Sequence, residues 1–197
     1  MEQKPHRVCP WWLGYWLASP LRRLSYRPED ILAGHVREGM TVLEPGPGMG
    51  FFTLELARMA GAAGRVVAVD IQPRMLASLR RRAAKAGLLD RIDARLTPAE
   101  SLGVADLAGR VDFTLAFAMV HELPSAARFF REVAEASKPG ARLLLVEPAG
   151  HVKQADFDGE LAAAREAGFT RVESPAVRRG RAALLEGAFS DRRSAVS

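Results

Sequence analysis

The chain has 197 residues, of which 48% are hydrophobic and 26% are charged, a balance that excludes a disordered or fibrous protein and fits one globular domain with short appendages. Its net charge of +5 would suit a polyanionic partner, but the arginines are scattered, so we expect a solvated surface and no nucleic-acid interface. The single cysteine excludes an intrachain disulfide, and no apolar run approaches the roughly 20 residues that span a bilayer. We therefore expect a cytoplasmic protein without a transmembrane segment.

Residues 1–40 differ in character from the rest of the chain. Four aromatic side chains stand close together there at helical spacing: Trp11, Trp12, Tyr15 and Trp16. Such a stripe fits packing on the domain, a cover over an active site, or peripheral contact with a membrane surface. We expect a short helical cap.

From Thr41 onward, short apolar runs typical of strands alternate with amphipathic stretches of helical period. This alternation predicts a parallel sheet covered by helices on both faces. The expected strands are 41–44, 65–70, 92–96, 111–120 and 142–147. The expected helices are 51–60, 73–87, 126–137 and 155–167.

Two further strands, 169–173 and 177–185, are separated by three residues, too few for a crossover helix, so this last pair should be antiparallel. The predicted fold is α/β: a doubly wound, mostly parallel, seven-stranded Rossmann-like sheet whose last strand is antiparallel. We divide the chain into an N-terminal cap (1–40), a main domain (41–186) and a flexible tail (187–197).

A glycine-rich loop, Glu44-Pro-Gly-Pro-Gly-Met-Gly50, joins the first strand to the first helix. Backbone without side chains at the carboxyl edge of a sheet allows a nucleotide ligand to approach closely. A dinucleotide fingerprint would need its third glycine at position 51, which is Phe51, and the Gly-Lys-Ser/Thr triplet of a P-loop is absent. A different nucleotide cofactor is indicated.

The spacing Gly46-x-Gly48-x-Gly50 resembles the first motif of the class I S-adenosylmethionine-dependent methyltransferases, and within them the small-molecule enzymes of the type 11 kind. The resemblance extends from about Thr41 to Leu185. It implies S-adenosyl-L-methionine as the cofactor. It also implies an N-terminal segment that closes the acceptor pocket, so we predict that Trp11, Trp12 and Tyr15 contact the substrate.

Further landmarks of this family follow in order along the chain. Asp70 closes the second strand, where the family uses a carboxylate on the ribose hydroxyls, and Ala99 and Glu100 lie in the segment that flanks the adenine. Many relatives carry an Asp just before that Ala, whereas this chain has Pro98. The resemblance implies the following cofactor contacts: Glu44, Gly46, Pro47, Gly48, Gly50, Asp70, Ile71, Ala99, Glu100 and Phe117.

Methyl transfer from a sulfonium needs an aligned nucleophile, exclusion of water and sometimes the removal of a proton. His121 follows the fourth strand beside Glu122, and its imidazole is a candidate base or a group that orients the acceptor. The alternative is a loop histidine that bonds only to backbone. We also name Glu147, at the end of the fifth strand, as a candidate substrate contact.

A metal or metalloid site is a further hypothesis, because four soft or borderline ligands follow separate segments: His6, Cys9, His121 and His151. Nothing in the sequence brings these segments together, and Cys9 fits equally well as a small buried apolar residue. We expect no bound metal.

The predicted function is S-adenosylmethionine-dependent methyl transfer to a small-molecule acceptor by in-line displacement. A non-catalytic cofactor-binding or interaction module is the alternative, because no catalytic base is assured. An NAD-dependent reductase is disfavoured by Phe51 and by the lack of a Tyr-x-x-x-Lys pair, and a base-amine methyltransferase by the lack of an Asn/Asp-Pro-Pro-Tyr/Phe tetrapeptide. The sequence leaves the acceptor and the oligomeric state open.

Overall fold

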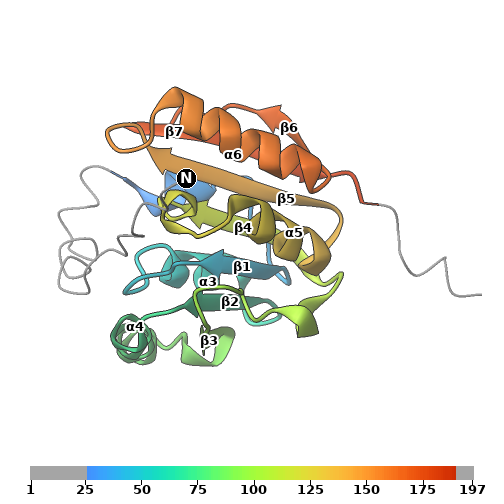
Figure 1. Cartoon of the computed structure of the whole chain (residues 1–197). Helices are drawn as coiled ribbons and strands as arrows, with labels where there is room; N and C mark the ends of the chain where they lie inside the picture. Colours follow the sequence, from blue (N-terminus) through green and yellow to red (C-terminus); the bar gives the residue numbers. More distant parts are fainter. Residues whose placement is uncertain (1–25, 190–197) are drawn as a thin grey trace, which may run out of the picture.

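A computed structural model of the chain describes residues 26–189, in which helices and strands alternate (Figure 1). The helices are α2 (Pro28–Leu32), α3 (Thr53–Ala60), α4 (Pro73–Lys85), α5 (Ala126–Ala136) and α6 (Gln154–Glu166). The strands are β1 (Thr41–Pro45), β2 (Arg65–Asp70), β3 (Ile92–Leu96), β4 (Val111–Phe117), β5 (Ser137–Pro148), β6 (Phe169–Glu173) and β7 (Gly180–Gly187). Short 3₁₀ helices are η2 (Leu89–Arg91), η3 (Ala105–Leu107) and η4 (Val120–Glu122).

The strands form one seven-stranded sheet in the order β3-β2-β1-β4-β5-β7-β6. Strands β1 to β5 pair in parallel, and β7 is antiparallel to both of its neighbours, β5 and β6. The predicted fold class is therefore confirmed, including the antiparallel last strand. The strand order reverses between β1 and β4, and ligands of open α/β sheets bind at such a reversal, beyond the carboxyl ends of the strands.

Each face of the sheet has its own hydrophobic core, because successive side chains of a strand point to opposite faces. On β5, Leu143 and Leu145 belong to the core that also contains the buried residues of α5 and α6, whereas Leu144 and Val146 belong to the core on the other face, with those of α2, α3 and α4. Helices α5 and α6 lie in front of the sheet in Figure 1. Burial on both faces explains why the central strands read as continuous apolar runs.

The fourth strand ends earlier than predicted, at Phe117 and not at Val120. The next residue, Ala118, has φ 56°, and its N–H donates to the carbonyl of Val146 at 2.7 Å. The chain then continues into η4. The predicted strand was too long because it was based on apolar character alone, and the residues of a tight turn can be as apolar as those of a strand.

Strand β5 and strand β7 also begin at other positions than predicted. Strand β5 starts at Ser137, which pairs with Val111, while Arg142 pairs with Phe113, so the expected Lys-Pro-Gly turn lies inside an irregular part of the strand. Strand β7 starts at Gly180, because the N–H of Gly180 donates to the carbonyl of Val177 and closes a turn there.

Part of the predicted N-terminal cap falls within the described residues. Helix α2 buries Leu32 in the core, and the ring of Tyr26 meets that of Phe117 edge-on, with 5.2 Å between the ring centroids. The predicted substrate contacts Trp11, Trp12 and Tyr15 lie outside the described residues. Among residues 26–189, no helix has the length and apolarity needed to cross a membrane.

Leu144 tests the two-sided burial of the sheet, because it lies on central strand β5 with 1% of its surface exposed. Leu144→Ala should lower the free energy of unfolding by about 2–5 kcal/mol, through lost apolar contacts and the cavity left behind. Urea unfolding followed by circular dichroism measures this. Val172→Ala, on β6 with 50% exposure, is the control and should change stability by less than about 0.5 kcal/mol. Equal losses in both variants would contradict this description of the core.

Candidate functional site

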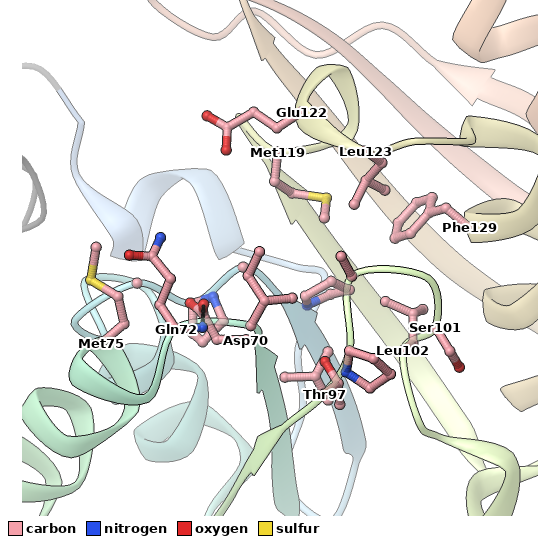
Figure 2. A pocket seen from close by; sticks show the side chains of 18 of the residues that line it. Asp70, Gln72, Met75, Thr97, Ser101, Leu102, Met119, Glu122, Leu123 and Phe129 are labelled. Atoms are coloured by element: carbon pink, nitrogen blue, oxygen red, sulfur yellow. Dashed lines mark hydrogen bonds between the residues drawn. The ribbon is translucent and has the colours of Figure 1, made fainter. Parts of the chain in front are cut away.

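A pocket of about 490 Å³ lies beyond the carboxyl ends of β1, β2 and β4 (Figure 2). Its wall comes from the glycine-rich loop, the end of β2, residues 97–102 after β3, residues 117–119 and 122–125 around and after the end of β4, and helix α5. The pocket therefore occupies the strand-order reversal, as the fold class requires. Eight of the predicted cofactor contacts line it: Gly46, Pro47, Gly48, Asp70, Ile71, Ala99, Glu100 and Phe117.

The three glycines of the loop all have positive φ, but their surroundings differ. A Cβ added to Gly46 would lie 3.2 Å from the Cβ of Met119, and one added to Gly50 would overlap the Leu79 side chain of α4. A Cβ added to Gly48 would meet no atom within 4 Å, because this glycine faces the pocket. Gly50 therefore serves helix packing and does not line the pocket, whereas Gly48 presents bare backbone to the pocket.

Asp70 ends β2 at the pocket with 8% of its surface exposed. Its Oδ1 accepts a hydrogen bond of 2.8 Å from the N–H of Gln72. Burial raises the pKa of Asp70 to about 6, and the nearby N–H groups of Gln72, Gly48 and Ile71 oppose that rise. At neutral pH this carboxylate is largely ionised and can accept hydrogen bonds from ligand hydroxyls.

Helix α5 holds the segment that contains Ala99 and Glu100. The Oε2 atom of Glu132 accepts hydrogen bonds from the Ser101 hydroxyl at 3.1 Å and from the Leu102 N–H at 2.6 Å. The guanidinium of Arg128 donates to the carbonyl of Glu100 at 3.0 Å. This anchoring fixes the backbone that lines the pocket after β3.

The wall after β4 is mainly apolar. Figure 2 shows Met119, Leu123 and Phe129 on one side of the pocket, with Asp70 and Thr97 across from them. The ring of Phe117, at the end of β4, packs on that of Phe52 with 4.5 Å between the ring centroids. A ligand between these walls would meet polar groups on one side and mostly carbon and sulfur on the other, where the carboxylate of Glu122 is the charged exception.

His121 and Glu147, the candidate base and substrate contact, lie outside the pocket lining but contact each other. The Nδ1–H of His121 donates to Oε2 of Glu147 at 2.5 Å, and this hydrogen bond is the main cause that raises the pKa of His121 above its usual value. Glu147 has no exposed surface, and its Oε1 accepts from the N–H of Val120 at 2.8 Å. Glu44 is likewise buried outside the lining.

The metal hypothesis finds no support in the part of the chain that is described. His6 and Cys9 lie outside it, and His151 is exposed in the turn after β5. Within residues 26–189, no three His, Cys, Asp or Glu side chains are arranged to hold a metal ion.

Several lining residues escaped the sequence analysis, above all those of α5 and the residue that caps it: Ser125, Arg128, Phe129 and Glu132. In the sequence, a helix that follows a strand indicates a cover for the sheet, and nothing local marks the first half of α5 as part of a pocket wall. One signal was present, since Arg128 and Glu132 stand four residues apart and share a helix face.

Comparison with known proteins identifies the relatives of this chain. The family model described as methyltransferase domain matches residues 43–145, more than half of the chain. The ubiquinone/menaquinone biosynthesis C-methyltransferase UbiE of Klebsiella pneumoniae is 31% identical over 112 residues, which cover 57% of this chain and 44% of that protein. The ubiquinone biosynthesis O-methyltransferase of Methylocella silvestris is 33% identical over 137 residues, covering 68% and 51%. The chain thus spans about half the length of the curated relatives it matches.

Among solved structures, a SAM-dependent methyltransferase from Aquifex aeolicus superposes with a TM-score of 0.80 at 23% identity, covering 91% of this chain and 98% of that one. This likeness shows a shared fold. With the family model matched across β1 to β5, and with the glycine loop and Asp70 at the pocket, the chain belongs to the class I S-adenosylmethionine-dependent methyltransferases.

Proposed function

We propose that this chain binds S-adenosylmethionine in the pocket and transfers its methyl group to a small-molecule acceptor with an apolar surface. The observation that carries the proposal is the pairing of Gly48, whose bare backbone faces the pocket, with the buried carboxylate of Asp70 beside it. A side-chain-free loop next to a carboxylate at the end of the second strand fits a ligand that carries a ribose.

The residues present fit the cofactor. Asp70 would accept hydrogen bonds from the ribose hydroxyls, the backbone at Gly48 would lie against the amino-acid portion, and Ala99 and Glu100 would flank the adenine. When bound, the cofactor supplies a methyl group made electrophilic by a positively charged sulfonium.

The charge of the lining supports a cationic ligand. Among the described lining residues, the carboxylates of Asp70, Glu100, Glu122 and Glu132 stand against the single guanidinium of Arg128. Negative potential in a concave site attracts positive ligands and strengthens where water is excluded. The lining therefore favours the sulfonium cofactor over an anionic one such as a dinucleotide.

The acceptor would lie against the wall formed by Met119, Leu123 and Phe129, which excludes water from the transferring group. Two relatives named above carry ubiquinone biosynthesis in their names, and an apolar wall suits an aromatic acceptor of this general kind. We include Trp11, Trp12 and Tyr15 in the proposal as acceptor contacts, on the basis of the family resemblance alone.

A second candidate function is cofactor binding without methyl transfer. It is favoured by one observation: His121, the candidate base, lies outside the lining of the pocket. Methyl transfer to an acidic or already nucleophilic acceptor needs no base, so this observation does not decide between the two functions.

Titration calorimetry with S-adenosylmethionine and with its product S-adenosylhomocysteine tests the shared part of both candidates. We expect one binding site per chain for each ligand. The dissociation constants should lie in the micromolar range, which corresponds to a binding free energy of about −8 kcal/mol. Absence of heat with both ligands would refute the cofactor assignment. Incubation with labelled S-adenosylmethionine and a panel of quinols, phenols and amines then separates the two: transfer to any acceptor establishes the enzyme.

Gly48→Val should reduce the affinity for S-adenosylhomocysteine by about a hundredfold or more, because a branched side chain would occupy the space of the ligand. The matched control is Gly109→Val. Gly109 has φ 63° and also no atom within 4 Å of an added Cβ, but it lies away from the pocket. Both variants carry similar backbone strain, of about 1–2 kcal/mol, so calorimetry isolates the ligand effect. Similar affinities in the two variants would contradict the role of Gly48.

The affinity for S-adenosylhomocysteine should fall as the pH drops below about 6. Burial raises the pKa of Asp70 from 3.8 to about 6 in the unliganded protein, so below that pH the carboxyl must lose a proton before both of its oxygens are free to act only as acceptors for the ribose hydroxyls. Well below pH 6 the affinity should fall by about tenfold for each pH unit.

The raised pKa of Asp70 also affects the stability of the fold. The free energy of unfolding should decrease as the pH rises from 3.8 toward 6, since the folded state holds the proton more tightly than the unfolded state.

Asp70→Asn removes the titrating group and keeps its shape. Calorimetry between pH 5 and pH 8 should show weaker binding whose pH dependence is flat across this range. If the affinity of Asp70→Asn depended on pH as steeply as that of the wild-type protein, a group other than Asp70 would be responsible for the pH dependence.

A further inference from the structure

Residues 118–122, called here the β4 turn, form part of the pocket wall under backbone strain. Ala118, Met119 and Glu122 line the pocket. Ala118 has φ 56°, a left-handed conformation that a residue with a Cβ adopts only at a cost. Such strain persists only where the surrounding structure holds the backbone in place.

The end of β5 supplies that hold through three hydrogen bonds. The carbonyl of Val146 accepts from the N–H of Ala118 at 2.7 Å. The carboxylate of Glu147 accepts from the N–H of Val120 at 2.8 Å on Oε1 and from Nδ1 of His121 at 2.5 Å on Oε2. Two of the three thus end on one fully buried side chain.

The β4 turn packs directly on the glycine-rich loop. A Cβ added to Gly46 would lie only 3.2 Å from the Cβ of Met119, so the two segments are already in close contact. Any shift of the turn would move Met119 against the loop or open a gap beside it. The position of the turn therefore affects both the loop wall and the apolar wall of the pocket.

We propose that Glu147 is a positioning residue, which acts through Val120 and His121 to hold the β4 turn, and with it Met119 and Glu122, at the pocket wall. The proposal rests on the proposed function only in taking the pocket as the site of cofactor and acceptor. In this proposal Glu147 and His121 do not contact the ligand but hold the residues that line the pocket.

The electrostatic surroundings agree with this role. Glu122 on the turn lies 4.0 Å from Nε2 of His121, and Glu160 of α6 is buried near Glu147 and His121, with Asp156 close to it. Burial, followed by the charge of Glu147, raises the pKa of Glu160 to about 8, so Glu160 is mostly neutral at pH 7. Glu147 then carries the charge that pairs with the imidazole, and a buried carboxylate without such partners is costly.

The test uses the full-length chain with Glu147→Leu, Glu147→Gln and the control Glu160→Gln. Leucine removes both acceptors. Glutamine keeps an oxygen for the Val120 N–H, and its amide can donate to Nδ1 of a neutral His121. Glu160→Gln removes a neighbouring buried carboxyl that is mostly uncharged at pH 7. Each protein is examined by amide hydrogen exchange, by NMR titration of His121 and by calorimetry with S-adenosylhomocysteine.

We expect Glu147→Leu to speed exchange of the Val120 N–H by about a hundredfold and to weaken S-adenosylhomocysteine binding by about tenfold. Glu147→Gln should keep most of the Val120 protection while the pKa of His121 drops below that in the wild-type protein, because the partner charge is gone. Glu160→Gln should leave Val120 exchange and S-adenosylhomocysteine binding close to wild type, and it should lower the pKa of His121 less than Glu147→Gln does, because the charge of Glu160 is a smaller cause of that raised pKa than the hydrogen bond to Glu147. Should Glu147→Leu fail to fold, His121→Ala still removes the hydrogen bond to Oε2 of Glu147, and Glu147→Gln still removes the charge of the pair.

Wild-type exchange at Val120 together with wild-type affinity in Glu147→Leu would overturn the proposal, as would an unchanged His121 titration in Glu147→Gln. If the wild-type protein does not bind S-adenosylhomocysteine, the proposed function fails. The exchange and titration measurements still decide whether Glu147 holds the β4 turn.

Discussion

The parallel pairing of β1 with β2 on one side and with β4 on the other is the constraint on which the rest of the structure depends. It brings the carboxyl ends of three strands to one edge, and it sends the following chain to opposite faces of the sheet. The loops leaving β1 and β4 therefore separate there, and the space between them becomes the pocket. Glycine is needed in the loop for two reasons: Gly46 lies close to Met119, and Gly48 faces the open space of the pocket.

The fold was largely predictable from the sequence because its signals are local. The alternation of apolar runs and amphipathic stretches identified all seven strands, and the short spacing before the last strand predicted its direction. The errors fell at ends of elements. The apolar residues Ala118, Met119 and Val120 beyond β4 belong to no strand, because Ala118 turns the backbone to bond with Val146, a partner that is distant in sequence.

The candidate site was predictable only where a motif marks the residues. The resemblance to the family points to the loop glycines, Asp70, Ala99 and Glu100, and all of these except Gly50 line the pocket. Arg128 and Glu132 did not follow, because their role depends on how α5 packs beside the segment after β3. His121 and Glu147 were singled out by their places after β4 and β5, but their mutual hydrogen bond, which turns both away from the lining, depends on the packing between two loops.

Helix α5 links the core to the pocket. Its Phe130 and Val133 are completely buried between the sheet and α6, while Glu132 and Arg128 on the same helix hold the segment after β3. Local opening of the segment after β3 therefore has to break its contacts with α5, and α5 is held by the core. The free energy of opening of this segment is thus linked to the global stability of the fold. A ligand held by residues 98–102 would in turn stabilise the whole layer in front of the sheet, and substitutions deep in the core, far from any ligand atom, would weaken binding through the same helix.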